Sequence, residues 1–211
     1  ALDIFKFEAF PQQWANAQNN LADSYIFRVK GDRADNIEQA ICHLDQALKV
    51  RERQTLPYQW AKTQTNLASA YFYRIKGDRT DNNEQAIKHC REALTIYDPD
   101  AYPNDCRMIS QNIGSLFLED HRWKEASDSY KLAAISSERL YQAALFTSSK
   151  EAELMEQGKI YRCAAYSIAK SGKTENAIVM FELGRARVLG DSMARDRADL
   201  ERVREEDPHA Y

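Results

Sequence analysis

Two stretches of the chain decide its fold: residues 30–41 read KGDRADNIEQAI, and residues 76–87 read KGDRTDNNEQAI. They start 46 residues apart, and the same spacing relates residues 1–2 to 47–48 and to 93–94, all of which read AL. A fixed period of this length is typical of stacked helical hairpins, in which each repeat buries its apolar face against its neighbours. The sequence therefore predicts an all-α fold, a right-handed superhelical solenoid of antiparallel helix hairpins.

A small residue followed three positions later by a large apolar one marks the first helix of each predicted hairpin. The small side chain lets the two helices of a hairpin approach closely, and the large one fills the space beside the contact. We therefore expect close helix contacts at four positions. The pairs are Ala22 with Tyr25, Ala68 with Tyr71, Gly114 with Phe117, and Ala165 with Ile168.

Repeat spacing divides the chain into units of unequal length. The interhelix loop of the third repeat is six residues shorter than those before it, and the fourth repeat follows the third after 51 residues. The helices on either side of residues 146–149 should therefore be longer than the others. The expected division is a remnant of a preceding repeat (1–10), four repeats (11–56, 57–102, 103–147 and 148–190), and a C-terminal capping or linker helix (191–211) towards a missing domain. A chain that starts within a repeat is expected to be a fragment.

The ends of the predicted helices carry turn and cap residues. Gly31 follows an apolar-periodic run and can take the left-handed conformation that ends a helix, as can Gly77 and Gly172. Asp35, with Glu38 three residues later, is the expected N-cap and capping box of the following helix, and both recur 46 residues on.

Composition excludes several classes of protein. Lys and Arg number 29 against 32 acidic residues, so no global basic field favours nucleic acid. No run reaches the roughly 18 apolar residues that a membrane helix needs, and the first residues show no signal-peptide pattern, so we expect a cytoplasmic protein. The four cysteines are expected to be reduced core residues, and Trp14 and Trp60 to lie in the core. They are Cys42, Cys90, Cys106 and Cys163.

Two adjacent Cys-His pairs, Cys42-His43 and His89-Cys90, raise the possibility of a metal site or a nucleophile with its base. Adjacent residues on a helix point about 100° apart, so neither pair can direct both side chains at one atom. The better interpretation is a structural cysteine beside a surface histidine. We therefore expect no catalytic residue, no metal and no cofactor in this chain.

Several phrases of the sequence resemble a known family. They are QNNLA (18–22), the stretch 30–41, KEAEL (150–154), GRARVLG (184–190) and RDRADL (195–200). They look like the long-period tetratricopeptide repeats of CHAT-domain proteins, in which a caspase-like peptidase domain follows the repeats, and the resemblance covers nearly the whole chain. It implies a regulatory or recognition arm, with the peptidase cysteine and histidine lying beyond the present sequence. Some members of that family act with RNA-guided bacterial defence effectors.

A candidate binding surface is the concave groove lined by the first helix of each hairpin. Asn20, Asn66 and Asn112 recur there at spacings of 46, and such a row of amides could hold the backbone of an extended peptide. It looks like the Asn ladder of kinesin light chain repeats. Each Asn could equally bond a neighbouring helix and order the stack. The candidate groove residues are Asn16, Asn19, Asn20, Asp23, Lys62, Asn66, Ser69, Tyr73, Asn112, Arg162 and Tyr166.

The sequence thus favours a non-catalytic protein-protein interaction module, the tetratricopeptide arm of a CHAT-type peptidase. Its expected partner is a protein or peptide in the groove, or its own downstream CHAT domain. Nucleic acid is not expected, because acidic neighbours offset the C-terminal arginines, and no membrane is expected. The alternative is a free-standing tetratricopeptide scaffold or an oligomerising adaptor without a peptidase.

Overall fold

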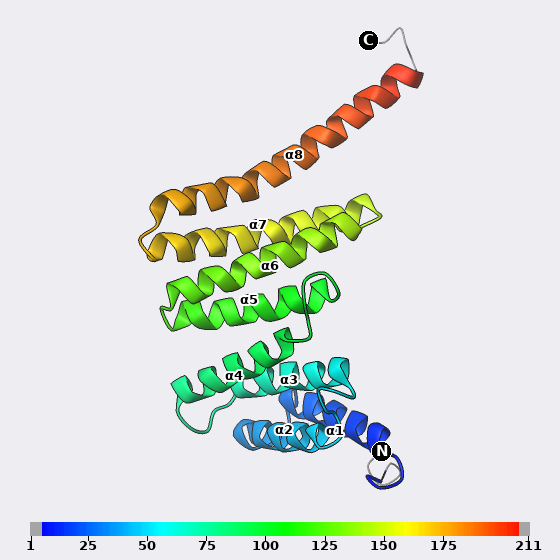
Figure 1. Ribbon diagram of the computed structural model, residues 1–211, viewed down its shortest axis with the longest axis vertical. Coiled ribbons are helices and arrows are strands. Elements are labelled where there is room, and N and C mark those ends of the chain that lie inside the picture. The colour runs from blue at the N-terminus through cyan, green and yellow to red at the C-terminus, as the bar shows by residue number, and fades with distance from the viewer. Residues whose placement is uncertain (1–5, 207–211) are drawn as a thin grey trace. The chain divides into compact units, whose positions relative to one another are not determined.

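The computed structural model describes residues 6–206, with side chains left out at 147, 188, 191, 194–196, 198–200 and 202–206. Within that range it holds eight helices and no strand, which confirms the all-α prediction (Figure 1). The helices are α1 (Pro11–Ile26), α2 (Arg33–Leu48), α3 (Pro57–Phe72), α4 (Arg79–Leu94), α5 (Pro103–Glu119), α6 (Trp123–Ala143), α7 (Thr147–Lys170) and α8 (Thr174–Glu206).

The chain forms two compact units, residues 1–109 and 110–211, and α5 crosses the boundary between them. In the first unit α1 packs on α2 and α3 on α4, and α3 also packs on α2. One buried cluster joins α1, α2 and α3, since Leu67 and Ala70 of α3 pack with Ala22, Ile37 and Leu44 of the first hairpin. Within this unit the hairpins therefore stack as the 46-residue period predicts.

Proline and aspartate define where the helices of the first unit begin. Pro11 and Pro57 occupy the first turns of α1 and α3, where a missing N–H costs nothing. The N-caps of α2 and α4 are Asp32 and Asp78, and the backbone N–H of Asp35 donates to Asp32 Oδ1 at 2.9 Å. The prediction that Asp35 caps α2 is therefore wrong by three residues.

Gly31 explains that difference. It has the left-handed φ of 86°, and Gly77 and Gly172 have φ of 83° and 84°, as predicted. Gly172 directly follows Ser171, the C-cap of α7, but Gly31 and Gly77 lie four residues after the C-caps Phe27 and Tyr73, so the prediction that these two glycines end the preceding helices is wrong. In both hairpins of the first unit the residue directly after this glycine is extended and faces the first free N–H groups of the next helix. The cap position therefore belongs to the aspartate beside the glycine, and Glu38 is left for another contact.

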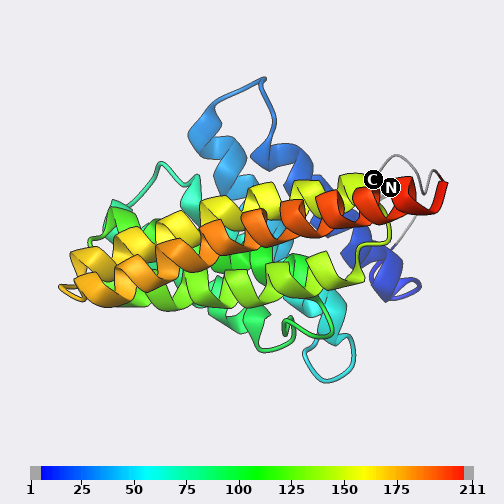
Figure 2. The same cartoon turned by 90° about the horizontal axis from the view of Figure 1, so that it is seen from above.

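The second unit contains the longer helices. α6 has 21 residues and α7 has 24, against 16 in each of α1 to α4, as the spacing around residues 146–149 predicts. α6 packs on α7 and α7 on α8, and the three run along a common direction (Figure 2). α8 continues for 33 residues through the boundary expected at residue 190, and it diverges from α7 towards its C-terminal end (Figure 1).

Glycine permits two close helix contacts in the second unit. A Cβ at Gly114 would lie 2.9 Å from the Tyr130 ring, and one at Gly184 would lie 2.6 Å from Tyr161 Cβ. Ser115 and Tyr130 also share a hydrogen bond of 3.0 Å beside the first contact. The close approach predicted at Gly114 is confirmed.

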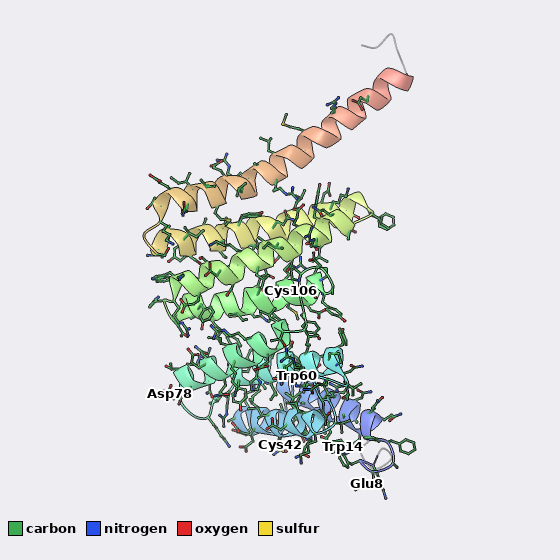
Figure 3. The ribbon with its side chains drawn as sticks, viewed as in Figure 1. Glu8, Trp14, Cys42, Trp60, Asp78 and Cys106 are labelled. Atoms are coloured by element: carbon green, nitrogen blue, oxygen red, sulfur yellow. The ribbon has the colours of Figure 1, made fainter. Side chains whose placement is uncertain are left out.

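Two groups of residues expected in the core lie partly outside it. Trp14 and Trp60 are half-buried near the starts of α1 and α3, and Trp14 meets Phe7 edge to face at 5.1 Å (Figure 3). Cys90 and Cys106 are buried, whereas Cys42 is exposed and Cys163 is half-buried. The expectation of four core cysteines is therefore wrong for Cys42, whose position on α2 points outward. Among the described residues, no helix combines the length and apolarity needed to cross a membrane.

Candidate protein-interaction site

The first helices of the two hairpins in the first unit present equivalent polar stripes. Their members follow each other at intervals of four, three and four residues, so each stripe lies on one face of its helix. α1 contacts α3, and Asn66 Nδ2 donates to Asn19 Oδ1 at 3.3 Å across the contact. We call the combined surface the amide face; it comprises Asn16, Asn20, Asp23 and the C-cap Phe27 of the first hairpin with Lys62, Asn66, Ser69 and Tyr73 of the second hairpin.

The predicted groove residues divide between the two units. Asn66 and Ser69 on the amide face are half-buried, and its other members are exposed. Asn112, Arg162 and Tyr166 are also exposed, but they belong to the second unit. There Tyr166 meets Trp123 edge to face at 6.2 Å and lies under Lys170 Nζ.

Asn19 lies beneath the amide face, because its side chain is 1% exposed. Its Oδ1 accepts a hydrogen bond from Arg51 Nη1 at 3.0 Å and one from Asn66. The amide oxygen of Asn19 is therefore engaged inside the protein. Among the three asparagines of the predicted row, Asn66 bonds a neighbouring helix through this contact, so the structural alternative is realised at Asn66. Asn20, one residue after Asn19, carries the exposed amide.

A buried arginine that the sequence analysis missed holds the two first helices together. Arg51, in the loop after α2, is 5% exposed, and its guanidinium donates to Asn16 Oδ1 at 2.7 Å and to Thr63 Oγ1 at 2.7 Å. Its partners are neutral oxygens, and burial lowers the pKa of Arg51 from its ordinary value. The aligned residue of the next repeat is Tyr97, and this break in the repeat was the one available clue in the sequence.

The two histidines of the second helices are interhelical rather than superficial, which corrects the prediction of surface residues. His43 Nδ1 lies 2.6 Å from Gln18 Oε1, and His89 Nδ1 lies 2.6 Å from Gln64 Oε1. An amide oxygen can only accept, so Nδ1 carries the hydrogen in each ring. His43 stacks on Tyr25 with ring centroids 5.5 Å apart, and His89 stacks on Tyr71 at 5.3 Å.

Burial keeps these histidines neutral. Burial lowers the pKa of His89 to about 4, with a smaller contribution from the charge of Lys88, and burial also lowers the pKa of His43. Both rings are thus fixed in hydrogen-bonded stacks, while the neighbouring Cys42 is exposed. Among the described side chains, no group of three or more His, Cys, Asp or Glu is arranged to hold a metal ion.

The stack continues into an ion pair between the hairpins. The Arg74 guanidinium lies over the Tyr71 ring at 5.6 Å and reaches Glu38 of α2 with two bonds, Nε–Oε1 at 2.8 Å and Nη2–Oε2 at 3.1 Å. This two-bond contact raises the pKa of Arg74 from its ordinary value. Beside it Lys76 Nζ donates to Asp35 Oδ1 at 2.8 Å. Two cations of the second hairpin therefore hold two carboxylates of the first.

Chemically, the amide face offers exposed amides, one lysine and two exposed aromatic rings, which suits recognition of another polypeptide. The second unit adds a largely apolar hollow of about 470 Å³ between α7 and α8, lined by Tyr161, Phe181 and Leu189 among others. Neither a protein-family model nor a curated protein matches this chain.

Proposed function

We propose that this chain is a non-catalytic protein-recognition module of the tetratricopeptide type. Its hairpins are proposed to continue into a right-handed superhelix, with the first helices lining the concave groove. The observation that carries the proposal is the amide face. Its exposed Asn16, Asn20 and Lys62 stand on helices fixed by the buried Arg51 network, so the surface is preorganised for binding.

The proposed ligand is an extended peptide or a loop of a folded protein. Side-chain amides donate to peptide carbonyls and accept from peptide N–H groups, which recognises a main chain without demanding one sequence. Phe27 and Tyr73 at the ends of the stripes are exposed and can contact an apolar side chain of the ligand. The proposal does not include a nucleic-acid ligand, because Lys62 is the one cation on the amide face and Asp23 offsets its charge.

For the whole protein, we propose that this module is the regulatory arm of a CHAT-type caspase-like peptidase. The support is the sequence resemblance at residues 150–154, 184–190 and 195–200, which corresponds to the segment leading into the peptidase domain of that family. Binding on the amide face would then control a peptidase domain that follows, either through an external partner or through direct contact with that domain.

The first experiment is to determine the coding sequence that follows Tyr211. A downstream domain with a histidine and a cysteine arranged for nucleophilic catalysis is the expected result. Peptidase activation is then measured in the full-length protein carrying Asn20→Ala and Lys62→Ala, two exposed members of the amide face. We expect weaker activation with unchanged activity once activated, and Lys88→Ala on the exposed side of α4 serves as the matched control. Unchanged activation in the double variant would refute the role of the amide face.

A free-standing scaffold or oligomerising adaptor is the second candidate. It is favoured by exposed apolar side chains along α8, among them Ile178, Phe181 and Leu189, because such surfaces mark association sites. This candidate predicts a stop codon or an unrelated domain after Tyr211, and self-association of the natural protein in sedimentation. A monomer with an attached peptidase domain would exclude it.

A further inference from the structure

A second hollow of the second unit lies between α6 and α8, both of which pack on α7. Its volume is about 270 Å³, and the buried side chain of Ile168 in α7 forms part of its floor. It shares no lining residue with the hollow between α7 and α8 or with the amide face. We call it the lysine groove, and its chemistry depends on Lys124, Lys131, Lys173, Val179, Met180 and Leu183.

The wall that α8 gives to the lysine groove is apolar and reaches solvent. Val179 is 60% exposed and Leu183, one turn later, is 50% exposed. Met180 beside them is half-buried, because it also packs on the buried cluster between α6 and α7. The wall is therefore held by the core while its outer side chains stay available for contact.

The dimensions of the groove suit the side chains of a polypeptide. Its α6 wall runs from Lys124 to Lys131 and its α8 wall from Asn176 to Leu183, which is about 10 Å along each helix. Enclosed small-molecule pockets usually measure about 300–1,000 Å³. A hollow just below that range, lying along two parallel helices, favours a segment that inserts a few side chains.

The rim of the groove is positively charged. Its lining holds three lysines against one carboxylate, and that carboxylate, Asp128, is already engaged by Lys131 Nζ at 3.2 Å. Among the described residues, neither Lys124 nor Lys173 forms an ion pair. These two lysines also adjoin the first turns of α6 and α8, where the helix dipoles add partial positive charge. This end of the groove therefore favours an anionic ligand.

An ion pair between the same two helices lies beyond the other end of the groove. Arg187 of α8 pairs with Glu138 of α6, and its guanidinium lies over the Tyr141 ring at 5.3 Å. This pair stands one turn beyond Leu183 and two turns beyond Lys131. Where the cation of one helix meets a carboxylate of the other, the pairing is complete within the chain. At the lysine groove the cations are present and a carboxylate has to come from a ligand.

We propose that the lysine groove binds an acidic amphipathic segment of another protein. Two neighbouring apolar side chains of that segment lie on Val179 and Leu183, and its carboxylates lie beside Lys124 and Lys173. The occupant follows from charge complementarity at the rim together with the exposed apolar wall. The site is separate from the amide face and does not depend on the function proposed for that face.

The test begins with a random peptide display library selected on the 211-residue chain. Counter-selection on a variant carrying Val179→Ser and Leu183→Ser removes peptides that bind elsewhere and does not bias their charge. If this variant does not fold, Val179→Ser alone replaces it. The surviving peptides should carry Asp or Glu beside two apolar residues.

A synthetic copy of the most enriched peptide is then titrated by fluorescence anisotropy. Lys124→Ala and Lys173→Ala should each weaken its binding by about threefold to tenfold, and less at high salt. Ile178→Ser is the matched control, because Ile178 is 58% exposed on α8 but does not line the groove; it should change binding by less than about twofold. Asn20→Ala with Lys62→Ala should leave binding unchanged, which separates this site from the amide face.

Three results would overturn the proposal: no peptide survives counter-selection, the survivors are neutral or basic, or both lysine variants bind as the unsubstituted chain does. A dimer of the 211-residue chain that Val179→Ser abolishes would overturn it too, because a second copy would then be the occupant.

Discussion

The hairpins α1/α2 and α3/α4 carry the same polar stack but complete it differently. In both, a glutamine fixes a histidine at 2.6 Å, the histidine stacks on a tyrosine, and an arginine covers the tyrosine at about 5.5 Å. Among the described residues, the arginine of the second hairpin reaches a carboxylate, Glu38 of the neighbouring hairpin, and the arginine of the first does not. The stack therefore forms within one hairpin, whereas the ion pair is a property of the junction between two.

The loops after α2 and α4 show the same distinction. Arg51 bonds Asn16, Asn19 and Thr63, while the aligned Tyr97 lies among the rings of Tyr58 and Tyr102 and donates its hydroxyl to the Tyr58 carbonyl at 3.3 Å. One loop thus fills the space beside the next helix with a charged network and the other with aromatic packing. The two repeats therefore share their helices, but the loops that follow α2 and α4 make different kinds of contact.

The largest expected difference between the two loops follows from removing Arg51. Arg51→Ala leaves the buried side of Asn16 Oδ1 without its donor, removes the shortest of the hydrogen bonds to Asn19 Oδ1 and opens a cavity, which should lower the free energy of unfolding by about 2–4 kcal/mol. Tyr97→Phe, the matched change, loses one 3.3 Å hydrogen bond and should cost less than about 1 kcal/mol. Urea unfolding of both variants checks this, and equal losses would contradict the distinction between the loops.

Gly184→Ala extends the comparison to the second unit, where Gly184 of α8 lies against Tyr161 of α7. The new Cβ would lie 2.6 Å from Tyr161 Cβ, so the helices must separate, at a cost of about 1–3 kcal/mol in unfolding free energy. Gly190→Ala in the same helix has no atom within 4 Å and should stabilise by about 0.5–1 kcal/mol. Thermal unfolding should therefore shift in opposite directions for the two variants, and a common direction would refute the close-packing argument.

Acid should destabilise the second hairpin more than the first. The pKa of His89 is about 4 in the folded protein against 6.5 ordinarily, so the unfolded chain binds a proton first as the pH falls. The stability contributed above pH 6.5 is lost progressively between about pH 6.5 and 4, by roughly 1–2 kcal/mol after allowing for partial exposure. The free energy of unfolding, measured in urea between pH 7 and 4.5, should depend less on pH in His89→Gln than in His43→Gln. If His89→Gln showed the same pH dependence as the unsubstituted protein, this prediction would be wrong.

The smallest expected effect is on the free energy of unfolding when either of the two arginines over tyrosine rings, Arg74 or Arg28, is replaced. Arg74→Ala removes a two-bond ion pair and should lower the free energy of unfolding by about 1 kcal/mol, whereas Arg28→Ala, with no carboxylate partner among the described residues, should change it by less than about 0.3 kcal/mol. A double-mutant cycle of Arg74 with Glu38 measures the pairwise contribution. A coupling energy near zero would mean that this ion pair does not hold the junction.

The sequence by itself determined the helical class, the 46-residue spacing, the left-handed glycines at residues 31 and 77, and the long helices flanking residues 146–149. These features depend on short-range periodicity and on local backbone preferences, which a sequence displays directly. The cap was misplaced because Asp32 and Asp35 both suit the role, and only the position of the preceding glycine chooses between them.

Tertiary structure alone decided where the polar groups of the candidate site lie. Gln18 and His43 are 25 residues apart, Asn19 and Arg51 are 32 apart, and Arg74 and Glu38 are 36 apart. Whether an asparagine at this face is buried, as Asn19 is, or exposed, as Asn20 is, depends on which neighbour approaches it. Helical periodicity orders residues along one element, but a buried hydrogen bond needs two elements in contact, and that contact exists only after the hairpins have packed.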